Sequence, residues 1–187
     1  LEWVKVGLQS YLRDGSDLVR AIADSGKQVF LDLKLHDIPN TMAKAMESLS
    51  TLPIGMLTLH AHAGEEALKR CAQTGKDILP ETLLLAVTVL TSMDQDALNS
   101  IGVQSPVIEQ VERLARVATQ SEIGGIVCSP HELVHLRACL PSKTKMVTPG
   151  IRPAGSAVGD QKRIMTPAEA KLAGADYLVI GRPILAA

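Results

Sequence analysis

One segment of the sequence combines lysine and aspartate in a pattern that suits acid–base chemistry. Residues 30–37 read FLDLKLHD, so leucines alternate with charged residues. Successive side chains of a β-strand point to opposite faces, and we therefore expect Asp32 and Lys34 on one face. Lys5, in the β-rich run WVKVG, is expected to point to the same place from the preceding strand. Balanced ammonium and carboxylate groups in a dry site supply a proton donor, an anion repeller and fixed dipoles.

A solvated edge strand is the alternative interpretation of this segment. On that interpretation Asp32 and Lys34 form an exposed pair worth at most about 1 kcal/mol. Strands of a closed barrel have no such solvent face. Buried charges persist when they are paired, because an unmatched one costs several kcal/mol. A barrel fold would therefore favour a functional array, with Asp37 just beyond the end of the strand.

Two arginines follow later β-rich runs and suggest a phosphate site. Arg152 ends the segment Val-Thr-Pro-Gly-Ile-Arg, and Arg182 follows Gly181 after the run YLVI. Glycine allows close backbone approach, and arginine binds phosphate through two parallel hydrogen bonds. Each arginine alone is more often a surface residue, but their positions at consecutive strand ends favour phosphate. The loop 153–159, rich in Gly, Ala and Ser, could close as a lid.

The elements that position these residues alternate between strand and helix. Expected strands cover residues 3–7, 28–35, 55–60, 83–90, 125–128, 145–149 and 177–180, and expected helices cover 14–24, 40–49, 65–73, 106–120, 130–138 and 167–173. Ser105, Ser129 and Thr166 each precede a proline, which is typical of a helix N-cap. This order predicts a parallel sheet with helices on its faces. A doubly wound sheet is the competitor, but no G-x-G-x-x-G follows the first strand. We predict a (β/α)8 barrel short of one strand.

Composition excludes several classes of protein. The 187 residues fit a single domain, 1–187, and 46% of them are hydrophobic, which is enough for a core. A net charge of −1 and 2% aromatic residues argue against a nucleic-acid partner. Apolar stretches are too short to span a membrane. The three cysteines, Cys71, Cys128 and Cys139, form no disulfide or CxxC pattern, so a reducing cytoplasm is the expected compartment.

Weaker candidates have ordinary structural explanations. His60 and His62 could ligate a metal, but no third ligand is evident, so a polar strand end is favoured. His135 lies four residues after His131 on an expected helix, which is typical of a solvated face. Cys128 is expected to be a small core residue. Thr91 and Ser92 either hydrogen-bond a ligand or cap a turn.

The segment 32–41, DLKLHDIPNT, resembles the signature of the bacterial orotidine 5′-phosphate decarboxylase family. Further segments occur in the family's order, and the resemblance covers essentially the whole chain: VKVG at 4–7, VTVLTS at 87–92, TPGIR at 148–152, DQ at 160–161 and IGR at 180–182. The resemblance implies decarboxylation of orotidine 5′-monophosphate to uridine 5′-monophosphate (UMP) in de novo pyrimidine biosynthesis. It also implies that neither a metal nor an organic cofactor takes part.

The resemblance assigns roles to the charged residues. Lys34 matches the lysine that protonates C6 of the pyrimidine as carbon dioxide leaves, and Asp32 matches the aspartate that crowds the substrate carboxylate. Lys5 matches the lysine that orients this array and contacts the ribose. Asp37, with Ile38 and Thr41, matches the part that reaches the partner's site in a homodimer.

Substrate contacts follow from the same resemblance. Thr91, with Ser92, matches the contact to the pyrimidine ring. The phosphate and lid contacts correspond to Arg152, Gln161, Gly181 and Arg182. The family begins with a strand ending in Ala-Leu-Asp, whose aspartate contacts the ribose, and it finishes with a terminal helix. This sequence is expected to lack both.

Two rival functions remain open at this point. Sugar-phosphate aldolases and decarboxylases of the same superfamily share D-x-K-x-x-D but use magnesium; residues 38–41, Ile-Pro-Asn-Thr, and the surroundings of Lys5 argue against them. A non-catalytic binder of a phosphate ligand, or an inactive fragment, is the other. Metal dependence separates the first rival, and binding without turnover separates the second.

Overall fold

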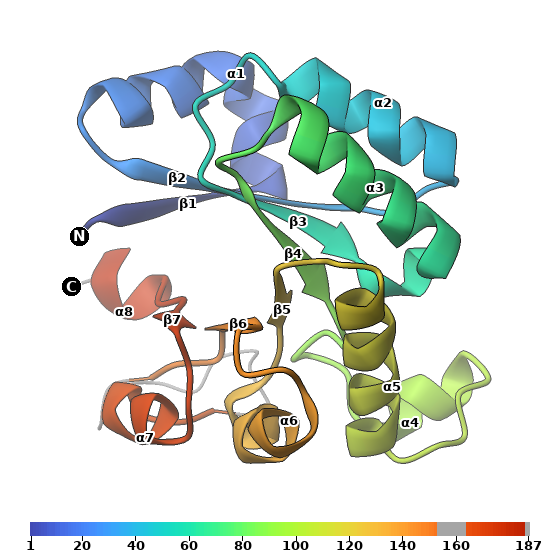
Figure 1. Cartoon of the computed structure of the whole chain (residues 1–187). Helices are drawn as coiled ribbons and strands as arrows, with labels where there is room; N and C mark the ends of the chain where they lie inside the picture. The colour runs from blue at the N-terminus through green and yellow to red at the C-terminus, as the bar shows by residue number, and fades with distance from the viewer. Residues whose placement is uncertain (153–163, 186–187) are drawn as a thin grey trace. The chain divides into compact units, whose positions relative to one another are not determined.

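The computed structural model describes residues 1–152 and 164–185 of the chain (Figure 1). It contains strands that alternate with helices along the chain. The strands are β1 (Trp3–Gly7), β2 (Gln28–Leu35), β3 (Met56–His60), β4 (Leu83–Val87), β5 (Gly125–Val127), β6 (Lys145–Thr148) and β7 (Tyr177–Leu178). No helix in these two ranges is long and apolar enough to cross a membrane.

Helices follow the strands in turn. They are α1 (Leu8–Asp24), α2 (Pro39–Leu49), α3 (Glu65–Ile78), α4 (Gln95–Ser100), α5 (Val107–Gln120), α6 (Leu133–Cys139), α7 (Pro167–Leu172) and α8 (Arg182–Leu185), with short 3-10 turns η1 (Ala61–Ala63) and η2 (Pro130–Glu132). Ser129 and Thr166 cap η2 and α7 as predicted, each in a reciprocal capping box. At α5 the first N–H, of Val107, instead donates to the Gln95 side chain.

The strands keep the order of the sequence, from β1 to β7. The pairs β1/β2, β2/β3, β5/β6 and β6/β7 are all parallel. A doubly wound sheet would reverse its strand order at a switch point, and this sheet does not. Sequential parallel strands joined by helices define the (β/α)8-barrel class, which confirms the predicted fold class.

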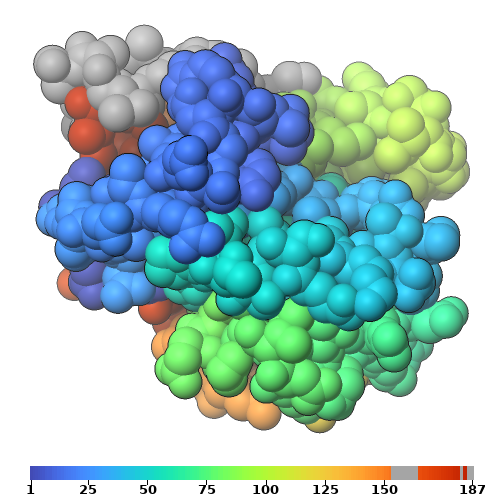
Figure 2. Space-filling view, turned by 90° about the horizontal axis from the view of Figure 1, so that it is seen from above, coloured from blue at the N-terminus to red at the C-terminus, as the bar shows by residue number. Residues whose placement is uncertain are grey.

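The chain divides into two compact units. The first comprises residues 1–86 and 120–124, and the second residues 87–119 and 125–187. In the first unit, α1, α2 and α3 lie on the same side of β1, β2 and β3 (Figure 1). Figure 2 shows the outer surface of these helices in blue, cyan and green. The helices and strands of this unit share a core that water does not reach. It includes Leu31 of β2 and Leu57 of β3, and on the helices Met42, Met46 and Leu68.

The second unit has its own core around β5 and β6. Ile126, Met146 and Val147 of the strands are fully buried, and so are Leu133 and Leu136 of α6. Cys128, next to β5, is buried as well, which confirms its prediction as a small core residue.

Several elements differ from the sequence prediction. α1 begins at Leu8, not at residue 14, and bends at Gly15, whose φ of +65° suits glycine. The strand expected over 83–90 ends at Val87. The short helix α4 was not predicted; Asp94 caps it by accepting the N–H of Ala97.

Candidate active site

Three of the charged residues predicted to cluster, Lys5, Asp32 and Lys34, do so in the first unit. Asp32 Oδ1 lies 2.8 Å from Lys34 Nζ, and Asp32 Oδ2 lies 3.1 Å from Lys5 Nζ. The Asp32 side chain is 12% exposed, whereas the two lysine side chains are 36% and 37% exposed. A buried carboxylate is therefore flanked by two cations whose side chains are partly exposed. An ammonium has three N–H groups, so each lysine can hold Asp32 and still donate to a ligand.

The parallel register of β1 and β2 brings Lys5 to Asp32. Gly7 lies directly opposite Asp32 in this pairing. A Cβ at Gly7 would come within 3.0 Å of Lys5 Nζ. The missing side chain thus leaves room for the ammonium to lie beside the carboxylate.

Lys34 departs from the regular strand that the sequence predicts. Leu31 pairs with Leu57, and Leu35 pairs with Leu59, so residues 32–34 lie opposite the single residue Thr58. Lys34 has a φ of +54°, a left-handed conformation that costs a non-glycine residue roughly 1–2 kcal/mol. The expected alternation along β2 therefore fails at Lys34, although its ammonium still reaches Asp32.

Thr58 is a site residue that the sequence analysis did not identify. Its hydroxyl oxygen accepts the backbone N–H of Lys34 at 2.8 Å, and its O–H donates to Asp32 Oδ1 at 3.1 Å. The Thr58 side chain is fully buried. One sequence feature could have indicated this residue. Thr58 is a polar side chain between two leucines, on the strand that follows the one carrying Asp32.

Burial and charge act in opposite directions on Asp32. Burial by itself raises the pKa of a carboxyl group, because it penalises the charged form. Attraction by Lys5 and the hydrogen bond from Lys34 outweigh that effect, and the pKa of Asp32 lies below its ordinary value. Asp32 is therefore ionised at neutral pH and presents a fixed negative charge.

Three histidines lie close to this cluster. The ring of His36 stacks on that of His60 at 5.2 Å, and the Nδ1 atoms of His60 and His62 are 3.2 Å apart. Burial, with the nearby charges of His62, His36 and Lys34, lowers the pKa of His60 to about 4. His60 is thus neutral at pH 7, and the polar strand end predicted for this segment includes a third ring, His36.

The segment expected to act across a dimer lies at the surface. Asp37, Ile38 and Thr41 are all exposed, and Ile38, a large apolar side chain, is 66% exposed. Asp37 Oδ1 accepts the backbone N–H of Ile38 at 2.7 Å, which precedes Pro39 at the start of α2.

The residues predicted to bind the pyrimidine ring and the phosphate belong to the second unit. Thr91 and Ser92 occupy a turn after β4. Arg152 is 7% exposed, and its Nη1 donates to the carbonyl of Ile151 at 2.8 Å. Among the described residues other than Gly181 and its two chain neighbours, no atom lies within 4 Å of the place a Cβ would take at Gly181. Gln161 lies outside the described residues, and so does the side chain of Arg182.

A possible metal-binding group lies elsewhere in the second unit. In the described part of the chain, Glu112, His135 and Cys139 bring one ligand atom each to within 4.8 Å of one another. The Glu112 carboxylate already binds Arg116 at 2.7 Å and His135 at 2.6 Å. The positive charge of Arg116 on the Glu112 carboxylate would repel a divalent cation. We therefore interpret this group as ordinary ion pairing and not as a metal site. His135, predicted to lie on a solvated helix face, is thus an exposed residue of α6 that pairs with Glu112 of α5.

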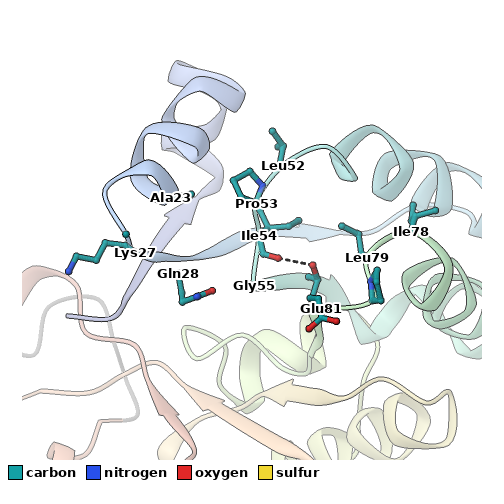
Figure 3. Close-up of a pocket in the computed structure, with 13 residues that line it drawn as sticks. Ala23, Lys27, Gln28, Leu52, Pro53, Ile54, Gly55, Ile78, Leu79 and Glu81 are labelled. Carbon is teal, nitrogen blue, oxygen red and sulfur yellow. Dashed lines mark hydrogen bonds between the residues drawn. The ribbon is translucent and has the colours of Figure 1, made fainter.

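A cavity of about 520 Å³ lies in the first unit, and Figure 3 shows the residues that line it. Its lining includes Gln28, Gly55 and Thr82, at or next to the amino ends of β2, β3 and β4. Asp32 and Lys34 lie toward the opposite, carboxyl end of β2. In barrels of this kind the carboxyl ends carry the chemistry, and the amino ends serve stability. We therefore take the charged cluster, not the cavity, as the candidate active site.

Fold and site together define a class, the (β/α)8-barrel enzymes with an acid–base cluster at the carboxyl end of a strand. Comparison with known proteins narrows this class. Residues 1–187 match the sequence profile of the "Orotidine 5'-phosphate decarboxylase / HUMPS family", and the chain belongs to that family.

Named relatives agree with this assignment. The chain is 54% identical over 187 residues to orotidine 5′-phosphate decarboxylase of Opitutus terrae, covering 100% of this chain and 81% of that protein. It is 49% identical over 181 residues to the enzyme of the same name from Anaeromyxobacter sp., covering 97% and 78%. The enzymes that carry this name are carboxy-lyases.

Solved structures share the fold. The structure of orotidine 5′-phosphate decarboxylase from Lactobacillus acidophilus aligns with a TM-score of 0.84 and 36% identity, covering 98% of this chain and 80% of that one. A conserved protein of Geobacillus kaustophilus, described as uncharacterized, aligns with a TM-score of 0.86 and 32% identity, covering 99% and 81%.

Proposed function

We propose that this protein decarboxylates orotidine 5′-monophosphate to UMP and carbon dioxide, without a metal or an organic cofactor. The observation that carries the proposal is the buried carboxylate of Asp32 between Lys34 and Lys5. Family membership and the name shared by the relatives support it.

Lys34 is assigned the role of proton donor. The bond between C6 and the carboxylate breaks, carbon dioxide leaves, and the electron pair stays on C6. A proton from the Lys34 ammonium then forms the new C6–H bond, and the neutral amine recovers a proton from water. A cation that stabilises the developing carbanion acts in the transition state, where it raises the rate.

Asp32 is assigned the role of opposing the substrate carboxylate. Two carboxylates about 4 Å apart at an effective dielectric near 20 repel by about 4 kcal/mol. Enzymatic accelerations need about 8–23 kcal/mol, so this repulsion can supply only a part. The fixed charges of Lys34 and Lys5 and the binding of the substrate phosphate must supply most of the remainder.

The remaining roles rest on the resemblance. Lys5 orients the cluster and contacts the ribose, and Thr91 with Ser92 contacts the pyrimidine. The phosphate is assigned to Arg152, Gln161, Gly181 and Arg182. A homodimer in which the surface residues Asp37, Ile38 and Thr41 reach the partner's site is part of the proposal.

The test follows the loss of substrate ultraviolet absorbance in the presence of EDTA. It is run on this chain, on the complete product of its gene, and on Lys34→Ala in both. Turnover that disappears in Lys34→Ala is expected. Turnover that appears only when EDTA is replaced by added magnesium would contradict the metal-free reaction. Calorimetric binding of UMP without any turnover by the complete product would make the protein a binder and would refute the proposal.

A further inference from the structure

We propose that Thr58 is a positioning residue, which holds the proton donor and the carboxylate of the cluster in fixed geometry. The inference rests on the proposed function and deepens it. Thr58 touches both halves of the pair: its oxygen accepts the Lys34 N–H at 2.8 Å, and its O–H donates to Asp32 Oδ1 at 3.1 Å. One hydroxyl thus ties the backbone of one residue to the side chain of the other.

The bulge in β2 explains why a side chain is needed here. Residues 32–34 lie opposite the single residue Thr58, so the backbone of β3 does not match them one to one. A buried N–H without a partner is costly, and native structures nearly always satisfy it. Because of the bulge, the N–H of Lys34 does not pair with the backbone of β3, and the hydroxyl of Thr58 accepts it instead.

The same hydrogen bond stabilises an unfavourable backbone conformation. Lys34 has a φ of +54°, which lysine adopts rarely. Residues in such conformations persist when their surroundings determine them, and they concentrate at functional sites. Here the conformation brings the Lys34 ammonium to 2.8 Å from Asp32 although both residues belong to the irregular part of β2.

Full burial makes Thr58 suited to this role. Its side chain is 0% exposed, so no bulk water can replace the hydroxyl. Asp32 Oδ1 receives hydrogen bonds from both Thr58 and Lys34 Nζ, which fixes the plane of the carboxylate. Without Thr58 we expect Lys34 to leave its left-handed conformation and Asp32 to rotate.

The test compares Thr58→Val, Thr58→Ser and the control Thr82→Val. Thr82 is a threonine of the same unit whose hydroxyl donates to a backbone carbonyl, that of Ile54, away from the cluster. In Thr58→Val we expect kcat to fall about 10- to 100-fold, the range for losing a hydrogen bond to a charged group, with KM within about threefold of wild type. Thr58→Ser keeps the hydroxyl, and we expect it to restore kcat to within about threefold.

Rates are normalised to the number of UMP sites measured by calorimetry, so that a loss of folded protein does not count as a loss of kcat. If Thr58→Val does not fold, Thr58→Ala is measured instead, and the same fall is expected. A normal kcat in the folded variant, or an equal fall in Thr82→Val, would overturn the proposal.

A second measurement does not depend on catalysis. Amide hydrogen exchange of Lys34, followed by NMR, is expected to be at least about tenfold faster in Thr58→Val than in wild type, and unchanged in Thr82→Val. If wild type shows no decarboxylation, the proposed function fails and this exchange still decides the role of Thr58. Equal exchange in wild type and Thr58→Val would refute it.

Discussion

Asp32 and Asp176 each bind two cations, and the two carboxylates differ in what surrounds them. Asp32 in the first unit binds Lys5 and Lys34. Asp176 in the second unit binds Arg137 and Lys145, and its Oδ2 accepts the Met146 N–H at 2.8 Å. The charges are the same in number and sign, so charge alone does not distinguish the two clusters.

The cations show the difference. Arg137 also donates hydrogen bonds to the backbone carbonyls of Thr144 and Gly174, which fix the position of its guanidinium group. Asp176 directly precedes β7, at the amino end of that strand. Asp32 is the more buried of the two carboxylates, with a side chain 12% exposed against 25% for Asp176, and both of its cations are lysines that are partly exposed. We infer that the cluster of Asp176 joins structural elements, whereas the cluster of Asp32 is arranged to meet a ligand.

The largest expected effect is on catalysis. Lys34→Ala should lower kcat for orotidine 5′-monophosphate by about 10²–10⁴-fold, because it removes the proposed proton donor. Lys145→Ala, which removes a lysine from the other cluster, should leave kcat unchanged. Steady-state kinetics at saturating substrate measures both. Near-normal turnover by Lys34→Ala, or equal losses in the two variants, would contradict the distinction between the clusters.

The next effect is on stability. Arg137→Ala should lower the free energy of unfolding by about 2–4 kcal/mol, since it leaves Asp176 short of a partner and two carbonyls without their donor. Activity per folded molecule should not change. Urea unfolding measures the loss, and kinetics on the folded fraction measures the activity. A stable variant with reduced kcat would reverse the roles assigned to the two clusters.

The first unit should also be sensitive to mild acid. The pKa of His60 is about 4 in the folded chain, against about 6.5 when unfolded, because burial and the nearby histidines disfavour its charged form. Between these values the unfolded state binds more protons, so the free energy of unfolding should fall as pH drops from 6.5 to 4. After allowance for partial exposure we expect a loss of about 1–2 kcal/mol.

His60→Asn is the control for this pH dependence. It removes the titrating ring and should flatten the fall between pH 6.5 and 4, although His62 still contributes. Urea unfolding of both proteins at several pH values gives the two slopes. Identical slopes would show that His60 does not cause the dependence.

The sequence predicted the parts that depend on local pattern. Period-two alternation placed Asp32 on a buried strand, and hydroxyl–proline pairs placed the caps at Ser129 and Thr166. The order of strand and helix gave the fold class, and the residues 32–41 gave the family. These features are short-range, so neighbouring residues were enough to specify them.

Tertiary contacts determined what the sequence did not predict. The left-handed backbone of Lys34 depends on Thr58, a residue of the next strand, and threonine is an ordinary strand former. Arg137 and Asp176 form an ion pair although they are far apart in the sequence, and no motif or spacing predicts such a pair. Leu8 starts α1 because a bend at Gly15 joins two helical pieces, and the pattern indicated only the second.

The smallest expected effect tests burial against charge within a single cluster. Lys145 and Arg137 bind the same carboxylate, but the Lys145 side chain is 49% exposed and lies 3.4 Å from Asp176, while Arg137 is 26% exposed. Lys145→Ala should therefore cost less than about 1 kcal/mol, and this cost should shrink further with added salt. Urea unfolding at low and high salt measures it beside Arg137→Ala. Equal losses in the two variants would mean that net charge at Asp176, and not the buried contacts of Arg137, stabilises this part of the second unit.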